Sequence, residues 1–96
     1  RGTVLGALRD VEDALAAFRA SRETVASLAR AEASAAKVEE LERQRFDLGA
    51  TGKPTYLEAE LAHNAAQQSL AQARAQLTIN FVTLQKALGL GWQSND

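Results

Sequence analysis

Hydrophobic residues in the first half of the chain recur at the spacing of a helix that packs against another helix. Apolar side chains stand in alternating steps of four and three residues at Val4, Leu8, Val11, Leu15 and Phe18. This spacing is typical of the seam of a coiled coil. Arg22 occupies the next seam position, and the apolar stripe resumes on a drifted line at Val25. We therefore expect strict heptad packing to relax near Arg22.

A second apolar stripe of helical spacing lies in the last third of the chain. Its members are Leu70, Ala73, Leu77, Phe81, Leu84 and Leu88. Polar but uncharged residues recur beside it at every fourth position, namely Gln68, Gln72, Gln76 and Asn80. Such a polar face fits a wall between a neighbouring subunit and water, and it fits an ordinary solvated surface equally well.

The two stripes are separated by Gly49, Gly52 and Pro54, the last being the only proline of the chain. Glycine adopts positive φ without a steric penalty, and proline cannot donate a hydrogen bond inside a helix. A helix is therefore expected to end here and another to begin. The chain then reverses direction at this point.

The predicted boundaries are a first helix over about 3–48, a tip at 49–54, a second helix over about 55–88 and a tail at 89–96. Thr55 and Glu58 fit a capping box at the start of the second helix, with Thr51 as an alternative cap. Gly89 is expected to end the second helix. The first helix is then the longer of the two, so its first turns would lack a partner.

Composition supports an all-α fold with little apolar surface. Twenty of the 96 residues are alanine, which has the highest helix propensity and a small side chain. We predict one long antiparallel helical hairpin, coiled-coil-like, over residues 1–96. Two such helices form a thin seam rather than a core, so the hairpin is expected to self-associate or to belong to a larger protein.

The chain shows no pattern typical of an enzyme, a metal site or a nucleic-acid-binding protein. The net charge is −1 with both signs interleaved, cysteine is absent, and no run of about 18 apolar residues could span a membrane. His63 has no second ligand in sequence, and Glu58 and Glu60 point in different directions on a helix. We expect no catalysis and no cofactor.

Four sequence segments resemble motifs of a known family. They are Ala7–Ala16, Gln44–Gly49, Tyr56–Glu60 and Leu84–Trp92, and they occur in the family's order and spacing. On these segments the chain resembles the C-terminal helical hairpin of TolC-like outer-membrane efflux proteins.

The resemblance implies a role in transport. In that family three protomers form one tube, with a β-barrel in the outer membrane of Gram-negative bacteria and an α-barrel in the periplasm. The chain would be an excised periplasmic hairpin of such a homotrimer, a passive conduit for drugs or other exported substrates. Its partners in a tripartite efflux pump would be a periplasmic adaptor and, through it, an inner-membrane transporter.

The resemblance also assigns roles to residues near the turn. The residues implied to form the adaptor-binding tip are Arg45, Phe46, Gly49, Ala50, Thr51, Gly52 and Lys53. Thr55 and Glu58 fall on positions that line the inner aperture in the family. Phe46 replaces the commoner tyrosine and lacks the hydroxyl implied to lock the closed tip in some members.

Two other interpretations compete with the channel. The chain could be a stand-alone antiparallel coiled coil that dimerises into a four-helix bundle and serves as an interaction or scaffold module. It could also be the hairpin of a periplasmic adaptor, but the Arg-Leu-Ser-Asp pattern usual at an adaptor's tip is absent.

Overall fold

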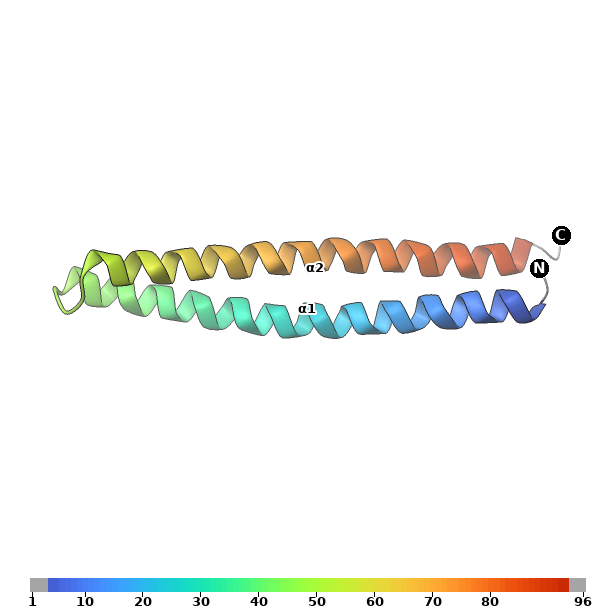
Figure 1. The fold of residues 1–96 in the computed structure, drawn as a ribbon, viewed down its shortest axis with the longest axis horizontal. Helices are drawn as coiled ribbons and strands as arrows, with labels where there is room; N and C mark the ends of the chain where they lie inside the picture. The colour runs from blue at the N-terminus through green and yellow to red at the C-terminus, as the bar shows by residue number, and fades with distance from the viewer. Residues whose placement is uncertain (1–3, 94–96) are drawn as a thin grey trace. The chain divides into compact units, whose positions relative to one another are not determined.

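The computed structural model describes residues 4–93 of the chain. These residues form two helices and no strand: α1 spans Val4–Asp47 and α2 spans Lys53–Gln93 (Figure 1). The helices pack as an antiparallel hairpin, which confirms the predicted all-α hairpin fold. The predicted helix start at Thr3 and residues 94–96 of the predicted tail lie outside the described residues.

The length of α1 follows from its composition. No proline occurs in its 44 residues, and its only glycine is Gly6 in the first turn. Alanine, leucine, glutamate and arginine fill most of the interior, and these residues lose little side-chain freedom in a helix. The helix therefore continues until Gly49 provides a conformation that ends it.

The boundaries of α2 differ from the prediction at both ends. The helix begins at Lys53, before Thr55, so Pro54 lies in its first turn and the predicted capping box does not form its start. Gly89 does not end the helix, which continues to Gln93. A glycine inside a helix costs only about 1 kcal/mol relative to alanine. Gly89 keeps a negative φ, so the two helices have nearly equal lengths of 44 and 41 residues rather than the expected unequal ones.

The hairpin divides into two units, each an antiparallel pair of helical segments. In the described chain, unit 1 pairs residues 4–25 of α1 with residues 73–93 of α2. Unit 2 comprises residues 26–72 and contains the turn. Each unit has its own seam between the helices, and the two seams differ in chemistry.

The seam of unit 1 is largely apolar. Its least exposed positions repeat in steps of three and four, at Ala7, Val11, Ala14, Phe18, Ser21 and Val25 on α1 and at Ala73, Leu77, Asn80, Leu84 and Ala87 on α2. The rings of Phe18 and Phe81 lie with centroids 5.8 Å apart. Apolar burial and ring contact therefore hold this pair of segments together.

The seam of unit 2 is mostly apolar on α2, whereas glutamates hold most of its positions on α1. Its least exposed positions repeat with the same steps, at Leu28, Glu32, Ala35, Glu39 and Glu42 on α1 and at Tyr56, Ala59, His63, Ala66 and Leu70 on α2. Glutamates thus occupy positions where a coiled coil normally places apolar side chains. This polar half-seam contains the cross-helix contacts of the candidate site.

The heptad does not fail at Arg22 as predicted. Ser21 occupies the seam position and is 9% exposed, so the repeat continues through a small polar residue. Arg22 lies beside the seam, with its guanidinium carbon 6.0 Å from the centre of the Phe18 ring. Val4 and Leu8 are 78% and 55% exposed, so the predicted stripe was displaced from the true seam at its beginning.

A polar layer crosses the seam of unit 1. The Asn80 side-chain amide donates hydrogen bonds to the Ser21 hydroxyl and, at 3.3 Å, to the backbone carbonyl of Ala17. Its oxygen accepts a bond of 3.0 Å from Gln76. A single asparagine in a coiled-coil seam favours one register, because other registers leave its amide without partners.

We expect the Ser21–Asn80 contact to contribute to stability as a coupled pair. In a double-mutant cycle of Ser21→Ala and Asn80→Ala, the coupling free energy should be about 1 kcal/mol. Urea unfolding followed by circular dichroism measures it. Asn64→Ala, at an exposed position of α2, is the control and should show no coupling to Ser21→Ala. A cycle that closes to zero would contradict the contact.

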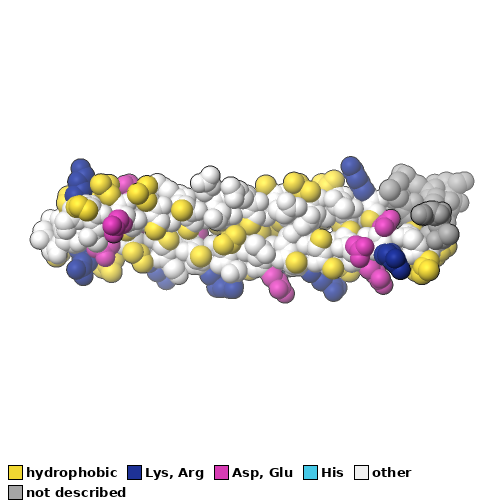
Figure 2. Space-filling view, in the orientation of Figure 1, with side chains coloured by type: hydrophobic (Ala, Val, Ile, Leu, Met, Phe, Trp, Pro, Cys, Tyr) yellow, Lys and Arg dark blue, Asp and Glu magenta, His cyan; other side chains and the backbone are white. Residues whose placement is uncertain are grey.

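The outward surfaces of the two helices differ in charge. Acidic and basic side chains occur along α1, whereas few lie over the middle of α2 (Figure 2). Arg74 is the only residue with a permanent charge between Leu61 and Gln85 of α2. Leu61, Ile79 and Val82 are instead 68%, 56% and 45% exposed on this helix. The outward surface of α2 is therefore poor in charge for a helix in water, with a few large apolar side chains exposed among uncharged polar ones.

Candidate functional site

The turn closes α1 by a Schellman motif centred on Gly49. The backbone amide of Gly49 donates a hydrogen bond to the carbonyl of Phe46 at 3.0 Å. The backbone amide of Ala50 donates one to the carbonyl of Arg45 at 2.8 Å. Gly49 has φ +78° and is the only described residue with positive φ. These bonds satisfy carbonyls that a helix end would otherwise leave without partners. The backbone of the tip is thereby fixed.

An aromatic pair joins the helices directly behind the turn. The rings of Phe46 and Tyr56 stack at 5.7 Å between centroids with an interplanar angle of 11°. Phe46 comes from the last turn of α1 and Tyr56 from the first turns of α2. The hydroxyl that Phe46 lacks is therefore present on the ring stacked against it. Sequence reasoning placed Tyr56 in a motif but did not pair it with Phe46.

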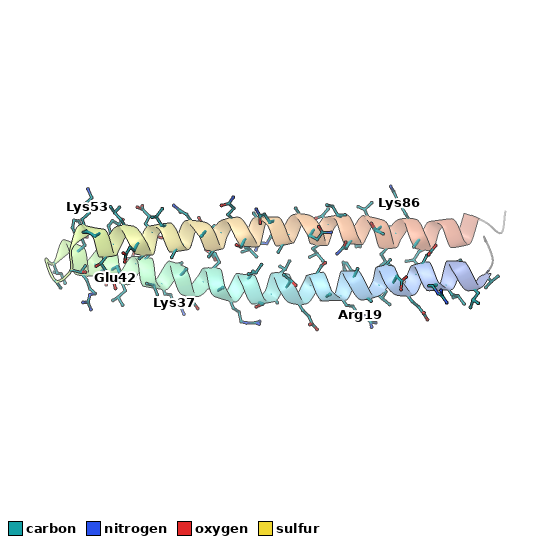
Figure 3. All side chains as sticks on the ribbon, viewed as in Figure 1. Arg19, Lys37, Glu42, Lys53 and Lys86 are labelled. Atoms are coloured by element: carbon teal, nitrogen blue, oxygen red, sulfur yellow. The ribbon has the colours of Figure 1, made fainter. Side chains whose placement is uncertain are left out.

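The other predicted tip and aperture residues lie on the turn or at the start of α2. Gly52 precedes α2 and is exposed, and Thr51 is half-buried. Lys53 begins the helix and points away from α1 (Figure 3). Thr55 and Glu58 are both exposed in the first turns of α2. The tip residues therefore form one accessible end of unit 2.

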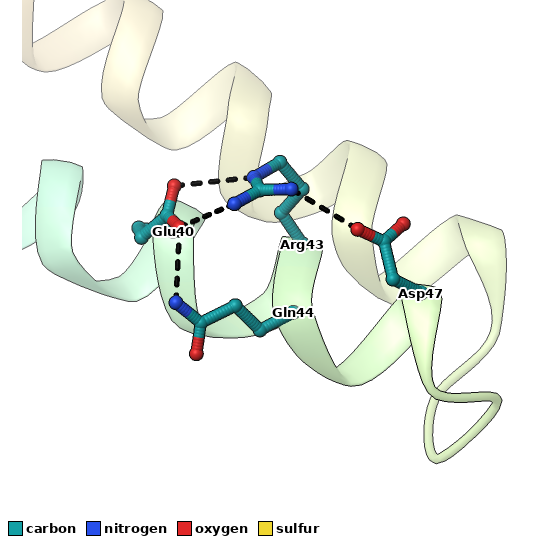
Figure 4. A network of polar contacts seen from close by, with 4 residues as sticks. All are labelled: Glu40, Arg43, Gln44 and Asp47. Carbon is teal, nitrogen blue, oxygen red and sulfur yellow. Dashed lines mark hydrogen bonds and ion pairs between the residues drawn. The ribbon is translucent and has the colours of Figure 1, made fainter.

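A network of charged residues stiffens the last turns of α1. Arg43 binds Glu40 through two nitrogens at 3.2 and 2.5 Å and reaches Asp47 at 3.0 Å, while Gln44 donates to Glu40 at 3.0 Å (Figure 4). The hydrogen bond from Arg43 holds the pKa of Glu40 below its usual value. All four side chains are exposed, so water screens these pairs and each adds little to stability. They nevertheless fix the side chains beside the tip.

Glu42 turns toward the seam instead of toward water. It points between the helices, whereas Arg19 and Lys37 point outward from α1 (Figure 3). Arg45 Nε lies 3.6 Å from Glu42 Oε1, and this oxygen accepts no hydrogen bond among the described residues. Arg45, a predicted tip residue, therefore forms an ion pair with a glutamate of the seam.

His63 bridges α2 to two turns of α1. Its Nδ1 lies 2.5 Å from Glu39 Oε1 and its Nε2 lies 2.7 Å from Glu32 Oε2. The side chains of His63, Glu32 and Glu39 are 15%, 26% and 24% exposed. We name this group the His63 bridge. The sequence analysis found no partner for His63, because both partners come from the other helix.

The pKa of His63 is raised above its ordinary value, first by the hydrogen bond to Glu32 and then by that to Glu39. Partial burial opposes the shift, but the two carboxylates outweigh it. The described residues contain no group of His, Cys, Asp or Glu that could hold a metal ion. The His63 bridge is a polar link between α1 and α2.

One open depression lies on α1 over Ala36, Lys37, Glu40, Leu41 and Gln44. It is shallow and exposes Leu41. It is too open to enclose a small molecule.

Comparison with protein families gives one match, which covers residues 1–90 and describes an outer membrane efflux protein. The chain belongs to the outer membrane efflux protein family. The predicted resemblance is confirmed on almost the whole sequence. Comparison with curated proteins and with solved structures gives no match.

Membership of the outer membrane efflux protein family gives the chain a role in an outer-membrane channel rather than in an enzyme. No helix within residues 4–93 has both the length and the apolar character needed to cross a lipid bilayer.

Proposed function

We propose that this chain is a periplasmic hairpin of a trimeric efflux or secretion channel and that its tip docks onto a periplasmic adaptor. The family match carries the channel part of the proposal. The channel itself is passive, and an inner-membrane transporter acting through the adaptor supplies the energy. The family match also favours the channel over a stand-alone scaffold module.

The geometry of the tip supports docking. The Schellman motif presents Gly49, Ala50 and Gly52 on a short, fixed turn with no bulky side chain over its backbone. A partner's backbone can approach such a turn closely. Lys53 and Arg45 add two cations at the same end, which can bind carboxylates or carbonyls of the adaptor.

The outward face of α2 supports assembly with neighbouring hairpins. Leu61, Ile79 and Val82 are each at least 45% exposed, and charged residues are scarce between them. Burying these side chains between subunits would recover apolar free energy that the isolated hairpin leaves unused. Glu58 and Thr55 remain the proposed aperture residues, and a ring of three Glu58 carboxylates would favour cations.

Cysteine cross-linking tests the docking, because the chain contains no cysteine of its own. Ala50→Cys, expressed in cells with the cognate adaptor and a bifunctional thiol–amine reagent, should yield a cross-link to the adaptor. Ala33→Cys is the matched control, because it is an exposed alanine in the middle of α1.

The control variant should give at least tenfold less of the adaptor product. Equal yields from the two positions would show that the tip has no special contact with the adaptor. The docking proposal would then fail, while the family assignment would stand.

A further inference from the structure

The geometry of the His63 bridge determines how many protons the imidazole ring carries. A neutral imidazole carries one N–H and one lone pair, whereas the imidazolium carries an N–H on both nitrogens. Both ring nitrogens face carboxylate oxygens, at 2.5 and 2.7 Å. Two carboxylates can accept from both nitrogens at once only if His63 is protonated.

No other cation can replace the imidazolium at this place. Among the described residues, no lysine or arginine forms an ion pair with Glu32 or Glu39. From α1, these two glutamates face His63, and Glu42 follows one turn nearer the tip. From α2 itself, the half-buried Glu60 lies one turn away. The charged groups around His63 are therefore all acidic.

We propose that the His63 bridge is a pH-sensitive latch that closes the tip-proximal seam of the hairpin when His63 is protonated and loosens it when the proton leaves. Deprotonation turns one N–H···carboxylate bond into a lone pair facing a carboxylate. Glu32 and Glu39 then share a seam with no positive charge. The latch acts within unit 2, because unit 1 contains no histidine.

The direction of the pH dependence follows from the raised pKa of His63 in the folded hairpin. The stabilisation is fully present below the pKa of a histidine in an unfolded chain, about 6.5. It is lost as the pH rises through the higher pKa of folded His63. The latch is thus closed in mildly acidic solution and loosens toward alkaline pH.

Proton NMR of the imidazole ring tests the linkage directly, because His63 is the only histidine in the chain. Its titration midpoint should lie above that of the double variant Glu32→Gln and Glu39→Gln. Each pH unit between the midpoints means tenfold tighter proton binding in the wild type. Glu12→Gln with Glu23→Gln removes the same charge from exposed positions of unit 1 and should leave the midpoint unchanged.

Equal midpoints in the wild type and the Glu32/Glu39 variant, with helical circular dichroism retained in both, would overturn the proposal. If the variant loses its helicity, the wild-type midpoint is compared with that of the 96-residue chain unfolded in urea. The wild-type midpoint must then be the higher of the two.

Amide hydrogen exchange tests whether the proton controls the seam. After correction for the intrinsic exchange rate, protection of amides in 56–70 should fall as His63 titrates, by at most tenfold per pH unit because one proton is linked. His63→Gln should make the profile of 56–70 flat. An unchanged slope in His63→Gln would refute the latch.

Discussion

Leu70→Ala is expected to lower the free energy of unfolding of the hairpin by about 2–3 kcal/mol. Leu70 is 6% exposed in the seam of unit 2, between alanine neighbours too small to fill the space it would leave. The loss should fall near the lower end of the range for buried leucines, because a two-helix seam can partly close or admit water. A loss of 2 kcal/mol raises the unfolded fraction roughly thirtyfold. Urea unfolding followed by far-ultraviolet circular dichroism measures the change.

Leu61→Ala provides the matched control for Leu70→Ala. Leu61 lies in the same helix and the same unit but is 68% exposed. Its removal should change the unfolding free energy of the isolated hairpin by about 0.5 kcal/mol or less. If both variants lost the same amount, the assignment of the seam of unit 2 would be wrong.

Gly49→Val is expected to destabilise the hairpin by about 1–2 kcal/mol and to impair the tip. The φ of +78° is unfavourable for any side chain with a Cβ and especially for a β-branched one. A Cβ at Gly49 would meet nothing within 4 Å, so the cost comes from the backbone and not from a clash. Thermal unfolding gives the stability change, and the cross-linking yield of Ala50→Cys in the same background reports the tip.

Gly52→Ser is the control for Gly49→Val. It tests whether the loss of stability comes from the positive φ at Gly49 or from replacing any glycine of the turn. Gly52 directly precedes α2, does not have a positive φ, and would place a Cβ in ordinary contact with Pro54 at 3.5 Å. Serine is favoured before the first residue of a helix, so this variant should be as stable as the wild type or slightly more stable. A loss equal to that of Gly49→Val would rule out the conformational explanation.

The fold could be predicted because its determinants are local. Helix propensity along α1 and α2 and the concentration of Gly49, Gly52 and Pro54 act over a few residues at a time. The prediction that the second helix ends at Gly89 was wrong, because a glycine allows a helix to end but does not force it to end. What ended α1 was the left-handed conformation at Gly49, and Gly89 does not adopt one.

The seam could be predicted only in part, since small and polar residues occupy several of its positions. Following the largest apolar residues led from Phe18 to Arg22, whereas the seam passes through Ser21. Hydrophobicity alone does not separate these neighbours. The sequence analysis likewise grouped Asn80 with the polar stripe of α2 and not with the seam, because its partner Ser21 on α1 is far away in sequence.

The His63 bridge could have been predicted from the register of the two helices. The sequence contains this register, but the search for apolar patterns did not use it. Reflecting the chain about the turn at 49–52 places His63 opposite position 38, between Glu32 and Glu39. The pairing of Phe46 with Tyr56 follows from the same reflection. The proposed roles of the tip residues depend on a partner protein, so neither the chain nor its fold alone determines them.

The glutamates in the seam of unit 2 have a consequence for how the hairpin fluctuates. Carboxylates contribute less contact area and less dispersion energy than leucines would in the same positions, so each helical turn near the loop is held more weakly than a turn near Phe18. Sub-global opening should therefore begin near the loop. The seam of unit 1 around Phe18 and Leu84 should be the region whose amides exchange most slowly. Such a gradient allows the helical turns behind the fixed tip to open and re-form when a protein docks, while the seam around Phe18 and Leu84 keeps the two helices in register.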